Sequence, residues 1–266
     1  MMKKTLKIVV LAKQVPDTRN VGKDAMKADG TVNRAALAAI FNPEDLNALE
    51  QALVLKDMFP GSRVEILTMG PGRAAEIIRE GMFRGADGGV LLTDRKFAGS
   101  DTLATSYALS RAALKMNPDI IVAGRQAIDG DTAQVGPAIA EHLGIPHAAW
   151  VGRLEAVGDG VDAEQHLQDV IETVHMPFPC LVTVEQDICM PRLPSLKTAR
   201  ETAQRVVHIQ GLDSFLDTDP DHYGLTGSPT QVERIFPPQS EVEHEIWEDA
   251  QAPKRLYTQL KKWKFI

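Results

Sequence analysis

The sequence is poor in the residues that build disulfide frameworks and metal centres. Its 266 residues include only two cysteines, Cys180 and Cys189, and these form no Cys-x-x-Cys pair. We therefore expect two reduced, buried thiols and no disulfide-stapled scaffold. The seven histidines show no spacing typical of metal ligands, so no bound metal is expected.

Long apolar stretches are also missing. The longest runs, such as 8–12 and 120–123, are far shorter than the roughly 20 residues that a membrane-spanning helix needs. Lys3 and Lys4 precede an apolar stretch without a small-residue cleavage site, so a strand is expected there rather than a signal peptide, and the protein is expected in the cytoplasm. The net charge of −7 argues against a nucleic-acid-binding surface.

What the sequence does contain is a regular alternation of β-rich runs and helical periodicity over residues 1–145. Strands are predicted at 6–12, 64–69, 89–93 and 119–123. Helices are predicted after each strand, and the first begins at Asn42-Pro43, where Asn42 can act as the N-cap. This alternation predicts right-handed crossovers and an α/β fold with a doubly wound parallel sheet between two helical layers.

The helical periodicity also predicts which side chains face the core. All four predicted helices, including the one after 70–72, carry apolar residues at helical spacing. The residues expected to point inward are Leu46, Leu49 and Leu53, then Ile77, Ile78 and Met82, then Leu103, Tyr107 and Leu114, and finally Val135, Ile139 and Leu143.

The pattern changes after Ala148. The Gly158-Asp159-Gly160 segment predicts a hairpin turn between strands at 151–157 and 170–174, and 181–184 reads as a further strand. From about residue 206 the chain is polar and irregular. We therefore expect an α/β domain over 1–206 and a C-terminal extension over 207–266, ending in an amphipathic helix with Leu256, Leu260 and Trp263 on one face. Such an extension lies across a partner or folds back on its own domain.

Ligands of open α/β sheets bind beyond the carboxyl ends of the strands. Four segments reach that edge and end in turn residues, and the most informative is 124–136. There, Gly124 and Gly130 allow close backbone approach, and the N–H groups of 131–134 are predicted to begin a helix that attracts phosphate. A glycine turn before a helix is by itself more often only a turn, but four such ends in register favour a nucleotide. The segment is neither a Walker A loop nor a GxGxxG fingerprint.

Few side chains at this edge could perform catalysis on their own. Asp101 and Asp129 could be general bases, although an aspartate before a helix is usually a cap. Arg125 could pair with a phosphate or stack on a ring, or could be a solvated loop residue. No nucleophile–histidine–acid set accompanies them. The sequence therefore favours a protein that positions a redox cofactor, which then carries the chemistry.

Several motifs of the chain resemble the β subunit of electron transfer flavoproteins over nearly its whole length. They are the segments 12–18, 42–45, 69–71, 101–105 and 124–136, and the longer run 184–196, which resembles the β-subunit signature of that family. The resemblance implies an α/β fold similar to that of adenine-nucleotide α-hydrolases. Together, the strand ends and these motifs assign cofactor binding to Leu11, Ala12, Asn42, Asp45, Thr68, Met69, Gly70, Pro71, Asp101, Thr102, Thr105, Gly124, Arg125, Gln126, Asp129, Gly130, Asp131, Thr132, Ala133, Gln134 and Val135.

The resemblance also implies two protein partners. One is an α subunit that carries FAD on a mobile domain and forms an obligate heterodimer with this chain. The other is an acyl-CoA-type dehydrogenase, which would dock on a recognition loop at 191–199 with Leu193 as the apolar anchor. The docking residues implied are Pro191, Arg192, Leu193, Pro194 and Leu196. This loop is shorter than in the ordinary branch of the family, which leaves the identity of the dehydrogenase open.

The family contains two branches that differ in the bound nucleotide. In the ordinary branch, the β subunit holds a structural AMP. In the electron-bifurcating branch, it holds an FAD that takes hydride from NADH and passes electrons to ferredoxin or flavodoxin and to the FAD of the α subunit. The small Gly130 and Ala133, together with 15–18, resemble the bifurcating branch. An adenine-nucleotide hydrolase or a binding module without a redox role is the remaining alternative, although 13–18 lacks the phosphate loop of such hydrolases.

Overall fold

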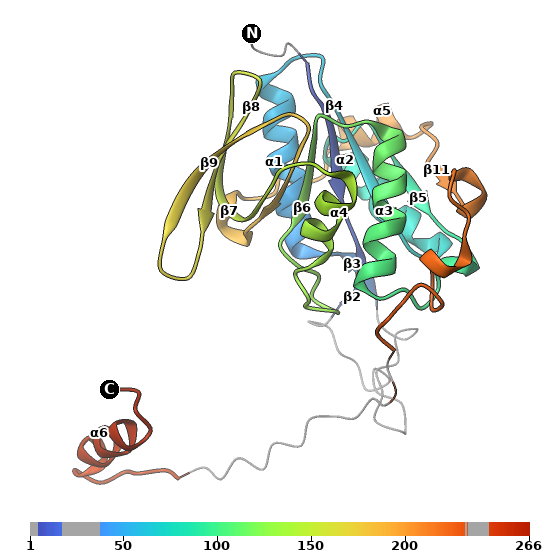
Figure 1. Ribbon diagram of the computed structural model, residues 1–266. Coiled ribbons are helices and arrows are strands. Elements are labelled where there is room, and N and C mark those ends of the chain that lie inside the picture. The colour runs from blue at the N-terminus through green and yellow to red at the C-terminus, as the bar shows by residue number, and fades with distance from the viewer. Residues whose placement is uncertain (1–4, 18–37, 232, 234–244) are drawn as a thin grey trace.

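The structure is a computed structural model that describes residues 5–17, 38–231, 233 and 245–266 (Figure 1). Thr18 of the first motif and the N-terminal lysines lie outside these residues. Within them, most strands form one nine-stranded sheet in the order β11-β5-β4-β1-β6-β10-β7-β8-β9. The chain winds outward from β1 to β4 and β5, and then continues on the other side of β1 with β6 and β10. This reversal places a topological switch point between β1 and β6.

The elements follow the expected alternation. The parallel strands are β1 (Lys7–Leu11), β4 (Arg63–Met69), β5 (Gly88–Leu92), β6 (Ile120–Gly124), β10 (Cys180–Val184) and β11 (His208–Gln210). β7 (His147–Val157) is parallel to β10 and antiparallel to β8 (Gly160–His166), which pairs with β9 (Ile171–Pro177). A separate pair joins β2 (Gln14–Pro16) to β3 (Ala39–Phe41). The helices are α1 (Pro43–Met58), α2 (Ala75–Arg84), α3 (Thr102–Met116), α4 (Val135–Leu143), α5 (Leu196–Thr202) and α6 (Ala252–Lys262).

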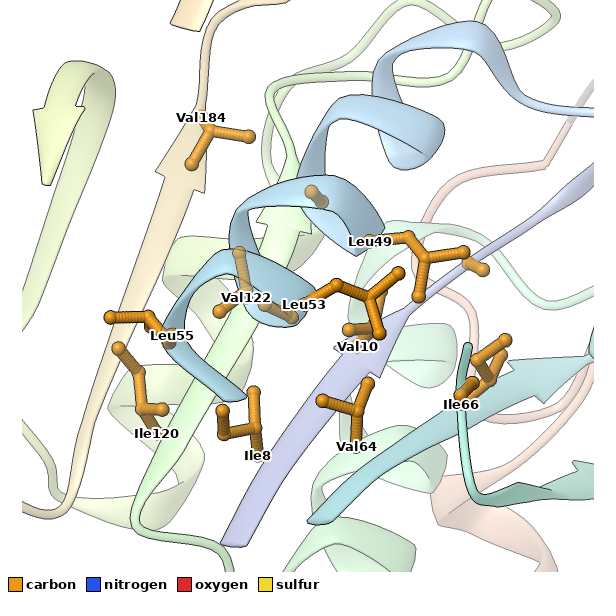
Figure 2. Close-up of a cluster of buried hydrophobic side chains, with 14 of the residues drawn as sticks. Ile8, Val10, Leu49, Leu53, Leu55, Val64, Ile66, Ile120, Val122 and Val184 are labelled. Atoms are coloured by element: carbon orange, nitrogen blue, oxygen red, sulfur yellow. The ribbon is translucent and has the colours of Figure 1, made fainter. Parts of the chain in front are cut away.

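Alternating side chains of the central strands build a core on each face of the sheet. Ile8 and Val10 of β1 face the layer of α1 and α2, whereas Val9 and Leu11 face the layer of α3 and α4. Figure 2 shows the first core, where leucines of α1 pack over apolar side chains of β1, β4 and β6. Both faces of the central parallel strands are therefore buried, and the predicted three-layer α/β fold is confirmed.

One predicted core face is wrong in part. Leu103 and Leu114 of α3 are 47% and 59% exposed, and Tyr107 is only half-buried. The buried face of α3 is instead built mostly from small residues such as Ala108 and Ala112, with Leu109 and Met116 beside them. Alanines one turn apart allow this helix to approach the sheet closely, so Leu103 and Leu114 turn outward.

The predicted hairpin is correct at its turn but wrong in its second strand. β7 ends at Val157 and β8 begins at Gly160, and these two residues pair directly. The predicted partner strand at 170–174 lies instead in β9, which pairs with β8. β8 escaped prediction because polar residues separate its buried Val161 and Ala163. The sheet thus carries an antiparallel edge beyond its parallel centre.

Gly160 is the position in this hairpin where a side chain fits least. A Cβ atom there would lie 2.0 Å from the carbonyl oxygen of Met176 on β9. We therefore expect Gly160→Ala to lower the free energy of unfolding by about 1–3 kcal/mol, since a backbone clash cannot be relieved by a rotamer change. Urea denaturation checks this, with Gly88→Ala as the control because a Cβ there meets nothing within 4 Å. Equal stability of the two variants would contradict the expectation.

The predicted boundary at 206 lies too early in the chain. β11 (His208–Gln210) joins the sheet beside β5, and Leu212, Phe215 and Tyr223 belong to the second core. Ser228 accepts a hydrogen bond from the backbone N–H of Asp101 at 2.8 Å. The α/β unit therefore continues to Ser228, because a short edge strand and three isolated apolar groups are enough to hold a polar segment on it.

Helix α6 forms where an amphipathic helix was predicted and stands apart from the α/β unit in Figure 1. Leu256 and Trp263 are 50% and 58% exposed, so the apolar face of α6 is not covered by the α/β unit. Pro237 and Pro238, which precede it, lie outside the described residues. Among the described helices, none combines the length and the apolarity that crossing a membrane requires.

Candidate functional site

A cavity of about 570 Å³ lies at the carboxyl ends of β4, β1 and β6, at the topological switch point. This is where open α/β sheets bind their ligands. Most of the predicted site residues line it: Leu11, Ala12, Asp45, Met69, Gly70, Asp101, Thr102, Thr105, Gly124, Arg125, Gln126, Gly130, Asp131, Thr132, Ala133, Gln134 and Val135. The structure thus brings together segments more than 100 residues apart in the chain.

Four predicted residues do not line this cavity. Thr68 is fully buried in β4, and Asn42 lies under the loop at 124–134. Pro71 and Asp129 line a second cavity of about 350 Å³. The two cavities adjoin, because both are lined by Lys13, Met69 and Gly70.

Other lining residues were missed from the sequence: Lys13, Leu67, Phe97, Gly99, Ser100, Leu109, Ala123, Ala127 and Gly136. Three of these residues could have been found because they lie within or next to segments that the sequence places at this edge. They are Lys13, Ser100 and Gly136. Phe97 and Leu109 reach the cavity from a 3₁₀ turn and from the middle of α3. No local pattern distinguishes these two from ordinary core residues.

The start of α1 holds the loop that forms one wall of the cavity. The Asn42 side chain donates a hydrogen bond from Nδ2 to the carbonyl oxygen of Gln126 at 2.9 Å and accepts one from the N–H of Ile128 at 3.2 Å. Glu44 accepts a bond from the N–H of Gln126 at 2.9 Å. Asn42 makes no side-chain cap bond to α1, so its predicted capping role is wrong. Its amide is used across the fold because both its donor and its acceptor find partners in the loop.

The second half of this loop presents free backbone donors to the cavity. Asp131 and Ala133 both adopt left-handed conformations with φ of 53°. The helix begins at Val135, later than predicted, because these conformations interrupt it. Within the described chain, no acceptor contacts the N–H groups from Thr132 to Gly136. Successive N–H groups in such a turn, continued by a helix N-terminus, form a concave site for an anion such as phosphate.

The opposite wall is formed by the start of α3. The Asp101 carboxylate accepts hydrogen bonds from the N–H groups of Leu103, Ala104 and Thr230, each at 3.0 Å. Burial raises the pKa of Asp101, but the hydrogen bonds from Ala104, Thr230 and Leu103 outweigh it and hold the pKa below its usual value. Asp101 is therefore an ionised helix cap rather than a base poised to take a proton.

The charged side chains at the rim are paired with one another. Lys13 Nζ lies 2.7 Å from Asp129 Oδ1, across the boundary between the two cavities. Arg125 lies 3.2 Å from Glu44 and sits over the ring of Trp150, 4.9 Å from its centre. The Nε atom of Arg125 is buried and has no hydrogen-bond partner among the described residues. This edge offers positive charge and donors, but no nucleophile paired with a base. In the part of the chain that the structure describes, no cluster of three acidic, histidine or cysteine side chains could hold a metal.

The predicted recognition loop forms a separate surface of exposed apolar side chains. Leu193 and Leu196 are 83% and 81% exposed, and Met190, which sequence reasoning did not select, is 90% exposed. Leu196 is the first residue of α5 rather than part of a loop. Arg192 points back to α1, where it bonds Glu50 at 2.9 Å and Asp57 at 2.9 Å. This anchor holds the apolar side chains outward.

The chain is similar in sequence to known proteins over most of its length. Residues 29–210 match the family described as electron transfer flavoprotein domain. The electron transfer flavoprotein subunit beta of Clostridium acetobutylicum is 45% identical over 229 residues, covering 86% of this chain and 87% of that protein. The acryloyl-CoA reductase electron transfer subunit gamma of Anaerotignum propionicum is 45% identical over 245 residues, covering 89% and 91%. The caffeyl-CoA reductase-Etf complex subunit CarD of Acetobacterium woodii is 41% identical over 234 residues, covering 88% of each.

Proposed function

This chain belongs to the electron transfer flavoprotein family as a β-type subunit, and from that premise we propose that it holds FAD in the cavity between β1 and β6. It works as one half of a cytoplasmic heterodimer with an α subunit that carries a second FAD. The observation that carries this proposal is the row of free N–H groups from Thr132 to Gly136, which lines a cavity at the switch point of the sheet.

The residues of the cavity fit an adenine nucleotide. The free N–H groups suit a phosphate, and Lys13 and Arg125 add positive charge at the same edge. The walls between them are apolar, with Leu11, Leu67 and Leu109 available to a flat ring system. A volume of about 570 Å³ lies within the range of roughly 300–1,000 Å³ common to small-molecule sites.

The adjoining second cavity supports FAD over AMP. AMP needs only the cavity around the 124–136 loop, whereas FAD needs room beyond the adenosine and its phosphates. The second cavity supplies about 350 Å³ of such room on the far side of Lys13, Met69 and Gly70. The first cavity is open beside Gly130, where a Cβ atom would meet only the end of the Lys13 side chain, at 3.9 Å. A structural AMP in the first cavity remains the alternative function.

The chemistry that FAD supplies when bound is the acceptance of a hydride from NADH and the release of its two electrons singly, one to ferredoxin or flavodoxin and one to the FAD of the α subunit. The role of the protein itself is to bind and orient this FAD. The N–H groups from Thr132 hold the phosphates, Asp101 fixes the start of α3 against the cavity, and the exposed Leu193 surface docks the acyl-CoA-type dehydrogenase that receives electrons from the α subunit.

A nucleotide hydrolase is disfavoured by the segment after β1. In a hydrolase of this kind, residues 13–16 would form a loop around the phosphate. In the structure, the last three of them form β2 (Gln14–Pro16), which pairs with β3. A strand at this place cannot wrap its backbone around a phosphate.

The proposal predicts the nucleotide content of the purified heterodimer. Co-expression with the α subunit, denaturation and chromatography should yield about two FAD per heterodimer and no AMP, since each subunit has one site. Addition of NADH should then bleach the flavin absorbance. One FAD with one AMP would establish the structural alternative instead, and a heterodimer with one FAD and no AMP would contradict both.

A further inference from the structure

A buried carboxylate, that of Asp45 in the first turn of α1, lies beside the cavity. Asp45 is only 7% exposed, yet it lines the nucleotide cavity. Its Oδ2 atom accepts a hydrogen bond from the N–H of Lys13, at the end of β1, at 2.8 Å. Its other oxygen, Oδ1, lies against the backbone of Gly124, at the end of β6, whose N–H helps to lower the pKa of this carboxyl. One side chain therefore joins the two strand ends that flank the switch point.

The fit around Asp45 is tight. A Cβ atom on Gly124 would lie 2.5 Å from Asp45 Oδ1, so the absence of a side chain at Gly124 is what admits the carboxylate. The Asn42 side chain supplies a further hydrogen bond, and Asn42 also holds the loop at 126–128. A change at Asp45 is thus transmitted to both strand ends and to the loop that carries the phosphate donors.

We propose that Asp45 is a positioning residue whose ionised carboxylate ties the ends of β1 and β6 together beneath the nucleotide, so that proton uptake by Asp45 and nucleotide binding oppose each other. The proposal rests on the proposed nucleotide site. The ionised carboxylate accepts from the N–H of Lys13 and attracts that of Gly124, whereas a protonated one turns an O–H toward one of them and loses that interaction. The protonated form therefore leaves the two walls of the cavity less firmly joined.

The surroundings of Asp45 allow this proton to move near neutral pH. Burial, with a smaller contribution from the neighbouring Glu44, raises the pKa of Asp45 to about 7, against the lowering effect of Lys13, Asn42 and Gly124. The other charged groups around it are already paired: Arg125 with Glu44, and the Lys13 ammonium with Asp129. No cation is paired with Asp45 in the part of the chain that the structure describes, so its charge is balanced by backbone donors.

The experiment measures FAD affinity as a function of pH in the heterodimer, with the α subunit already loaded so that only the site of this chain titrates. FAD is the probe because its phosphates are diesters, whereas a phosphate monoester such as AMP has its own pKa near 6. If this chain takes only AMP, ADP-ribose replaces FAD for the same reason. We expect the wild-type affinity to fall as the pH falls below 7, by at most about tenfold per pH unit for one proton.

The variant Asp45→Asn should bind at least about fivefold more weakly at pH 8 and should show no such slope, because its amide leaves one backbone N–H without an acceptor and does not titrate. Asp159→Asn, an exposed aspartate in the β7–β8 turn, is the matched control and should follow the wild type. Asp45→Ser takes the place of Asp45→Asn if that variant does not assemble. An Asp45 variant that keeps the wild-type slope, or a wild type without a slope, would overturn the proposal.

A second readout separates this inference from the proposed function. The infrared C=O stretch of a protonated carboxyl should disappear near pH 7 in the nucleotide-free wild type and at lower pH with nucleotide bound, and it should be missing in Asp45→Asn. If this band titrates but the wild type binds neither FAD nor ADP-ribose, the nucleotide site itself is wrong, and the coupling falls with it. If nucleotide binds but no band titrates near pH 7, only the role of Asp45 is overturned.

Discussion

Replacement of Ala133 by proline is expected to weaken nucleotide binding by about a hundredfold or more, corresponding to the roughly 3 kcal/mol that a misplaced proline costs. Ala133 has a φ of 53°, which the proline ring cannot adopt, and its N–H belongs to the row of free donors that faces the cavity. Equilibrium dialysis of FAD against the purified heterodimer measures the loss.

The matched control for this change is Ala133→Gly. Glycine keeps the N–H and adopts positive φ without strain, so affinity should stay within about twofold of the wild type and stability should not fall. The loop is exposed and contributes nothing to either core cluster, so both variants should remain folded. Equal nucleotide affinity of the two variants would show that the loop at 131–134 does not hold the phosphate.

Truncation of Leu193 to alanine is expected to reduce electron transfer to the dehydrogenase by about 30-fold, the effect of losing an interface hot spot of roughly 2 kcal/mol. Leu193 is 83% exposed, so its removal should leave folding and nucleotide content unchanged. The measurement is the rate of dehydrogenase reduction by the reduced heterodimer at limiting dehydrogenase concentration.

Leu216→Ala is the control, because Leu216 is also fully exposed but follows the 3₁₀ turn Leu212–Ser214 on another part of the chain. It should transfer electrons at the wild-type rate. If Leu193→Ala does the same while the heterodimer remains intact, the exposed surface around Leu193 is not the docking site. A loss with both variants would indicate that general surface hydrophobicity matters rather than this loop.

The antiparallel edge of the sheet could be predicted only in part from local sequence patterns. The turn at 158–160 was readable because glycines at a hairpin have a local steric cause. The strand after it was not, since β8, which lies between β7 and β9, carries mostly polar residues. β11, at the other edge of the sheet, is short and largely exposed. It forms a strand because it pairs with β5 rather than because its residues favour β structure.

The site shows the same division. Chain segments that carry turn residues after buried strands could be placed at one edge of the sheet from sequence, because parallel strands bring their carboxyl ends together. The use of each side chain could not. Asn42 resembled a helix cap and instead holds the loop at 126–128. Asp45 packs against Gly124, which lies 79 positions later in the chain.

By itself, the sequence determined the alternation of strands and helices, the parallel centre of the sheet, the edge that carries the candidate site and the family, because each of these follows from local periodicity, turn chemistry or motif. The tertiary structure decided which face of α3 is buried, where the α/β unit ends, and that Asp45 lies between the ends of β1 and β6. These features depend on contacts between residues far apart in the chain, whose energies no local pattern records.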